Sequence, residues 1–119
     1  MAIFWLINEY FCTMKNNRID SLLSFLKEDP EDAFVRFALA KEYEKLGTPK
    51  KALDTYLELK EMDPEYIGLY YHLGGLYQEL GEKEKALKTY EEGITLAKKI
   101  ADFHSLSELH NAKTNLEVE

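Results

Sequence analysis

The segment MDPEYIGLYYHLGGLYQELGEKEKALKTY, residues 62–90, is preceded by a similar segment, EDPEDAFVRFALAKEYEKLGTPKKALDTY, residues 28–56. Their prolines, Pro30 and Pro64, lie 34 residues apart. When residues 30–63 are laid over 64–97 without a gap, 12 positions are identical. A fixed period of this length predicts a structure built from repeated units.

Each unit has the pattern of two helices joined by a turn. We expect the first helix to begin at Asp29-Pro30-Glu31, and at Asp63-Pro64-Glu65 in the second unit. Aspartate is a good cap, proline suits the first helical position, and glutamate favours the positive end of the helix dipole. Gly47 and Gly81 are expected to end these helices, because the residue after a helix often needs a positive φ. Thr48-Pro49 then begins a second helix.

Both units also share an order of aromatic and small residues. In the first unit the matching residues are Leu39, Ala40, Tyr43, Ala52, Tyr56 and Pro64; in the second they are Tyr70, Leu73, Gly74, Tyr77, Ala86 and Tyr90. This order resembles the tetratricopeptide repeat, a helix–turn–helix unit of about 34 residues. Arg36 and Lys98 depart from the family pattern, in place of an aromatic residue and the closing proline. The Lys98 change predicts that the last repeat helix continues to about Ala101.

The resemblance implies an all-α fold. Antiparallel helix–turn–helix repeats would be stacked as a short right-handed solenoid that ends in a C-terminal capping helix. We expect one repeat domain over residues 14–119, whose parts are a half-repeat helix at 17–29, repeats at 30–63 and 64–97, and a helix extension with the capping helix at 98–119. The capping helix itself is predicted at residues 103–117, where leucines recur at helical spacing, with Asp102 at its start.

The apolar residues 1–13 are expected to be an N-terminal extension outside the fold. An extra packed helix and a membrane or export element are the alternatives. The segment is shorter than the ~20 residues of a membrane span. It also lacks the basic start and small-residue cleavage site of a secretory signal. Its single cysteine, Cys12, has no partner for an internal disulfide.

Composition argues against several classes of function. The net charge of −7 leaves no basic stripe for a nucleic-acid backbone. His72, His104 and His110 lack metal-ligand spacing, and no catalytic or phosphate-binding motif is present. We therefore predict a cytoplasmic, non-enzymatic protein with no catalytic residue, metal or cofactor.

The resemblance also implies a binding surface. In this family the first helices of successive repeats line a concave groove. The positions carried over to this sequence are Phe34, Phe37, Lys41, Glu44, Gly68, Tyr71, Gly75 and Gln78. The subclass that grips a C-terminal carboxylate uses lysine and asparagine there, and only Lys41 is suitable. We predict instead a groove with an aromatic floor, in which Gly75 makes a pocket beside Tyr71.

The predicted function is a protein–protein interaction module that binds a peptide or partner segment in this groove. One alternative is a structural homo-oligomer that self-associates through an apolar end or the groove, as a homodimer for example. Another is an adaptor attached to a membrane or cell envelope through residues 1–13. Phe34 and Phe37 are also open to a purely structural interpretation, as packing against preceding segments of the chain.

Overall fold

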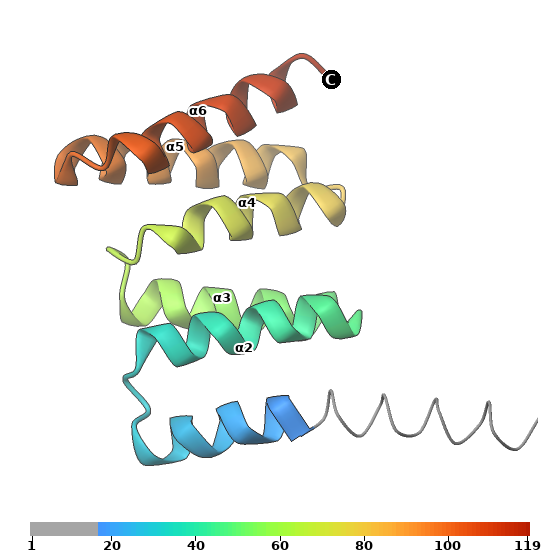
Figure 1. Cartoon of the computed structure of the whole chain (residues 1–119). Helices are drawn as coiled ribbons and strands as arrows, with labels where there is room; N and C mark the ends of the chain where they lie inside the picture. Colours follow the sequence, from blue (N-terminus) through green and yellow to red (C-terminus); the bar gives the residue numbers. More distant parts are fainter. Residues whose placement is uncertain (1–16) are drawn as a thin grey trace, which may run out of the picture. The chain divides into compact units, whose positions relative to one another are not determined.

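The computed structural model describes residues 17–119, and every regular element within this range is an α-helix (Figure 1). The predicted all-α class is therefore confirmed. The chain divides into two compact units, of which the first ends at Thr55 and the second comprises Tyr56–Glu119. The predictions for residues 1–13 concern a segment outside the described residues.

The first unit contains helical residues 17–28, then α2 (Ala33–Leu46) and the beginning of α3 (Pro49–Met62). Its buried apolar residues are Ile19, Leu39, Ala40 and Ala52. The ammonium of Lys51 on α3 lies 5.8 Å from the ring centre of Tyr43 on α2. Alanines at fully buried positions of both helices fit the prediction that small residues occupy these sites.

The second unit contains the end of α3, then α4 (Gly68–Glu79), α5 (Lys83–Ile100) and α6 (Phe103–Glu117). α5 packs against both α4 and α6. Lys85 lies 6.0 Å from the ring centre of Tyr77, which repeats the lysine–tyrosine pair of the first unit. The most deeply buried large side chains of this unit are Tyr56, Leu59, Leu69, Leu73, Leu76, Tyr90 and Leu109.

The predicted starts of the first repeat helices are wrong by several residues. α2 begins at Ala33, capped by the carboxylate of Asp32, which accepts the N–H of Val35 at 3.1 Å. The Asp-Pro-Glu sequences form turns instead. The N–H of Asp32 donates to the carbonyl of Asp29, and that of Tyr66 donates to the carbonyl of Asp63. Aspartate and proline are favoured at the first two positions of such a turn, so the same residues suit both structures.

The predicted helix ends are confirmed in both units. Gly47 has a φ of 82° and Gly81 has a φ of 77°. The N–H of Thr48 donates to the carbonyl of Tyr43, and the N–H of Glu82 donates to the carbonyl of Tyr77. Each bond satisfies a carbonyl that the helix end would leave without a partner. α3 begins at Pro49, as predicted.

The capping helix and its start are also confirmed. α5 continues to Ile100, and α6 spans Phe103–Glu117. The side chain of Asp102 accepts the N–H of Ser105 at 3.0 Å. This hydrogen bond to the charged form lowers the pKa of the Asp102 carboxyl from its ordinary value. Because Lys98 stands where the family has a closing proline, α5 continues past this position to Ile100.

The turn between α5 and α6 contains the one non-glycine residue with a positive φ within residues 17–119, Ala101 at 58°. Replacing Ala101 with glycine should raise the free energy of unfolding by about 1 kcal/mol, because glycine adopts this conformation without a Cβ penalty. Urea denaturation measures the change. Ala112→Gly, inside α6, is the matched control and should have the opposite sign. A loss of stability in Ala101→Gly would contradict this account of the turn.

The two adjacent glycines of α4 have different surroundings. A Cβ atom on Gly74 would lie 2.7 Å from Cδ1 and Cζ of the Tyr90 ring on α5, and closer still to Cε1. Gly74 is therefore the small residue where the two helices of the repeat approach each other. Among residues 17–119, a Cβ atom on Gly75 would meet nothing within 4 Å beyond its own stretch of helix. The structure of the helix does not require a glycine at position 75.

Candidate functional site

One face of α2 carries most of the predicted first-unit site. Phe34, Phe37 and Lys41 line a hollow of about 210 Å³. Phe34 is 69% exposed, and the ammonium of Lys41 lies 5.6 Å from the ring centre of Phe37. Glu44 is half-buried and does not line this hollow. The rest of the lining is Arg18, Ala38, Glu42 and Lys45.

The charged groups of this hollow are organised by Glu42. Its side chain is only 10% exposed, and its Oε1 lies 3.1 Å from Nε of Arg18 and 3.5 Å from Nζ of Lys45. A buried carboxylate needs such partners, because an unpaired charge there would be costly. The Arg18 and Lys45 side chains are themselves mostly exposed. One buried carboxylate thus positions two cations at the rim.

The predicted residues of the second unit do not all share one surface. Tyr71 is 43% exposed, and its ring meets that of His72 edge to face, with ring centres 5.6 Å apart. Tyr71 and Gly68 line a hollow of about 170 Å³ between α4 and α6, together with Ile67, His72, Ser105, Glu108 and Leu109. Gly75 and Gln78 are not part of this lining.

Gln78 makes a contact inside the unit. Its side-chain carbonyl oxygen accepts a hydrogen bond from the hydroxyl of Tyr90. Burial raises the pKa of Tyr90 to about 12, so the hydroxyl keeps its proton and remains a donor at neutral pH. The Gln78 amide therefore takes part in the contact between α4 and α5. At Gly75, by contrast, the space that a Cβ would occupy is open.

Several residues that line the two hollows are not among those predicted from the sequence. Lys45 follows Lys41 at the spacing of four that places side chains on one helix face, so it had a detectable signal. Arg18 comes from a different helix, and Ser105 and Glu108 come from α6. Whether such side chains reach a hollow depends on how the helices pack on one another. The repeat pattern in the sequence does not show this packing.

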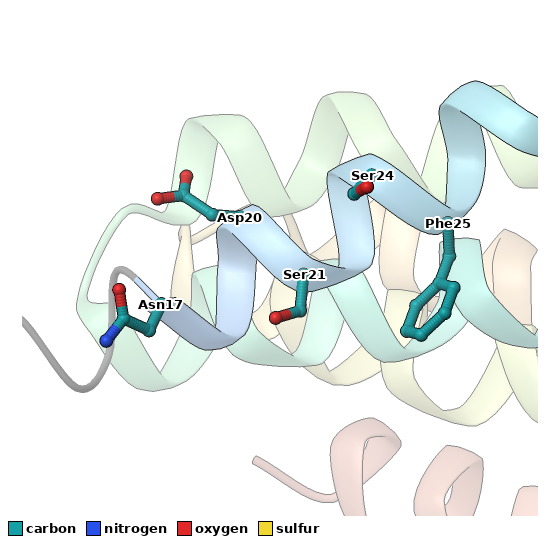
Figure 2. A pocket seen from close by; sticks show the side chains of 5 residues that line it. All are labelled: Asn17, Asp20, Ser21, Ser24 and Phe25. Carbon is teal, nitrogen blue, oxygen red and sulfur yellow. The ribbon is translucent and has the colours of Figure 1, made fainter.

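A larger hollow, of about 400 Å³, lies on helix 17–28 (Figure 2). Asn17, Asp20, Ser21, Ser24 and Phe25 line it, and Figure 2 shows that all five project from this one helix. A ligand pocket usually encloses most of its ligand, which requires walls from more than one element. Size alone therefore does not make this hollow the better candidate site.

Two further observations concern chemistry and membranes. Within residues 17–119, no three histidine, cysteine or acidic side chains gather as metal ligands. In the same range, no helix combines the length and the apolar character that crossing a bilayer requires.

Two helical hairpins with the same turns, glycine helix ends and lysine–tyrosine pairs define a helical-repeat protein. The family model of the tetratricopeptide repeat matches residues 35–66 and 67–100, and the chain belongs to this family. No curated protein matches the sequence.

Solved structures agree with this assignment. A tetratricopeptide repeat domain protein from Salinibacter ruber is 46% identical, with a TM-score of 0.72 over 75% of this chain and 90% of that one. The TPR2B domain of yeast Sti1, solved as a complex with pHsp70, is 22% identical, with a TM-score of 0.80 over 92% and 89% of the two chains. PcrH from Pseudomonas aeruginosa, solved with the chaperone-binding region of PopD, is 18% identical, with a TM-score of 0.79 over 94% and 85%. At these lower identities the similarity establishes the fold alone.

Proposed function

We propose that this chain binds a segment of a partner protein on the faces of α2 and α4. Tetratricopeptide repeats are in general non-enzymatic modules for protein–protein interaction. The proposed binding residues include exposed aromatic side chains, Phe34 on α2 and Tyr71 on α4. They lie at positions where the family binds its partners. Aromatic side chains are enriched among the residues that dominate binding energy.

The open space at Gly75 supports the part of this proposal that concerns α4. Apart from Gly75 itself, its chain neighbours and the nearby backbone of α4, no described atom lies within 4 Å of the position that a Cβ would take. A helix interior normally disfavours glycine by about 1 kcal/mol, so the residue has a cost that packing does not offset. Accommodation of a partner side chain beside Tyr71 would offset that cost. The Sti1 and PcrH structures support the proposal further, because both proteins share this fold and were solved with a bound protein partner.

The central test is a double substitution, Phe37→Ala with Tyr71→Ala. We expect partner affinity to fall about tenfold or more, because two large contact surfaces are removed. Proteins captured from the source cells by the wild-type chain and by the variant are compared by quantitative mass spectrometry. The affinity of each captured partner is then measured by titration.

The matched control is Phe103→Ala with Leu80→Ala, which removes two exposed apolar side chains elsewhere in the second unit. Captured partners should be retained by this control. Circular dichroism should show unchanged helicity in both variants. Equal capture by the wild type and by the Phe37→Ala, Tyr71→Ala variant would refute the assigned surface.

Self-association is a second candidate function, favoured by one observation. Leu23 and Phe25 on helix 17–28 are 43% and 57% exposed, so the first unit presents two large apolar side chains to solvent. Exposed apolar patches commonly mark protein interaction sites. Light scattering at two protein concentrations distinguishes this alternative from a monomer that binds another protein.

A further inference from the structure

The hollow of the first unit has a direction along α2. Its lining residues on that helix recur at spacings of three and one, so they form a single stripe: Phe34, Phe37, Ala38, Lys41, Glu42 and Lys45. The two phenylalanines lie toward the N-terminal end of the stripe and the two lysines toward the C-terminal end. Arg18 joins the cationic end, since it pairs with Glu42. The stripe therefore changes from aromatic to cationic along its length.

The charge of this hollow is opposite to that of the whole chain. The chain carries a net charge of −7, yet the lining holds three cations and one carboxylate. That carboxylate is buried and shared by Arg18 and Lys45, whose side chains are 67% and 65% exposed. Lys41 rests over the Phe37 ring. The excess positive charge thus borders apolar rings and faces solvent.

From this arrangement we propose that the hollow binds a partner segment in which side-chain carboxylates lie a few residues from an apolar side chain. The inference rests on the proposed function and specifies the chemistry of the partner. The apolar side chain would contact Phe34 and Phe37, and the carboxylates would pair with Lys41, Lys45 and Arg18. Complementary charge of this kind raises the association rate and fixes the register of the bound segment.

The helix geometry sets the spacing of the two features in the partner. Phe34 and Lys41 are seven residues apart, which corresponds to about 10 Å along the helix axis at 1.5 Å per residue. An extended peptide covers this distance in about three residues, at roughly 3.3 Å each. The expected partner sequence therefore has acidic residues about three positions from a leucine or an aromatic residue.

A random dodecapeptide library displayed on phage tests this inference, with the full chain as bait. Each peptide is fused to the coat protein through its C-terminus, so terminal carboxylates cannot contribute. We expect enriched peptides to carry aspartate or glutamate at this spacing from an apolar residue. Fluorescence anisotropy should show about tenfold weaker binding to Lys41→Glu with Lys45→Glu, because attraction is replaced by repulsion.

Two variants serve as controls. Lys83→Glu with Lys88→Glu makes the same change in net charge on exposed positions of α5 and should alter affinity less than about twofold. Lys41→Gln with Lys45→Gln removes the charges without creating repulsion, and it should give a smaller loss in the same direction. If Lys41→Glu with Lys45→Glu does not fold, the glutamine variant still tests the inference.

The possible results separate this inference from the proposed function. The inference would be overturned if the enriched peptides lacked acidic residues. It would also be overturned if they bound Lys41→Glu with Lys45→Glu as tightly as Lys83→Glu with Lys88→Glu. If such peptides still lose affinity for Phe37→Ala with Tyr71→Ala, the proposed function stands. If no peptide is enriched, or none depends on either surface, both proposals fail. The chain could also form a dimer that Lys41→Glu with Lys45→Glu dissociates. If this is seen while no peptide is enriched, the hollow binds a second copy of the chain.

Discussion

Leu109→Ala is expected to lower the free energy of unfolding by about 3 kcal/mol, within the range of 2–5 kcal/mol for deleting a buried leucine side chain. Leu109 lies on α6 and is only 1% exposed. Its Cδ1 atom would be 2.9 Å from a Cβ placed on Gly93, which shows how closely it packs on the backbone of α5. The substitution leaves a cavity at this contact, since a glycine has no side chain that could fill it.

Urea denaturation followed by circular dichroism measures this loss. Hydrogen exchange should also show faster exchange of the amides of α6, because the helix loses a main contact with α5. Leu80→Ala is the matched control: Leu80 is 41% exposed, so its loss should cost less than about 1 kcal/mol. Equal destabilisation by the two substitutions would contradict the role of Leu109 in anchoring the capping helix.

Gly93→Ala should destabilise the protein by about 2 kcal/mol, although the same substitution at Gly75 should stabilise it. A Cβ on Gly93 would lie 2.7 Å from Cβ of Tyr70, an atom fixed to the backbone of α4. Relief of this overlap requires movement of α4 relative to α5, and overpacking of this kind costs roughly 1–3 kcal/mol. At Gly75 the new methyl group meets open space, and alanine gains about 0.5–1 kcal/mol in helix propensity.

Thermal and urea denaturation of the two alanine variants should therefore give changes of opposite sign. Gly74→Ala should resemble Gly93→Ala in sign, because its Cβ overlaps the ring of the buried Tyr90. It should cost less, since a ring can shift further than a backbone-linked Cβ. Stabilisation by Gly93→Ala would show that α4 and α5 tolerate a wider separation than the structure indicates.

Much of the fold was predictable because the repeat duplicates its own local signals. The glycine ends at Gly47 and Gly81, the start of α3 at Pro49 and the capping helix after Asp102 all depend on nearby backbone geometry. The helix starts at Asp29 and Asp63 were mispredicted for the same reason. An Asp-Pro-Glu sequence satisfies the rules for a helix start and those for a turn, and local rules alone do not choose between them.

The site was less predictable, because its lining depends on which helices meet. The family resemblance placed Phe34, Phe37 and Lys41 on one surface, and in the structure all three line one hollow. The resemblance also placed Gln78 on this surface, and it gave no sign that the Gln78 amide accepts a hydrogen bond from Tyr90. Arg18 and Ser105 had no local signal at all. The role of Phe37, Tyr71 and Gly75 in binding a partner remains a prediction for the experiments described above.

The duplication of local contacts has a consequence for how such a chain can change in length. The glycine ends, the lysine–tyrosine pairs and the bonds from Thr55 and Thr89 to the carbonyls of Lys51 and Lys85 recur in both repeats. A genetic crossover between equivalent positions of the two repeats would insert or delete one whole period. Every helix end at the junction would keep a sequence that already forms it. Arrays of different length are thus accessible by recombination without new turns or caps.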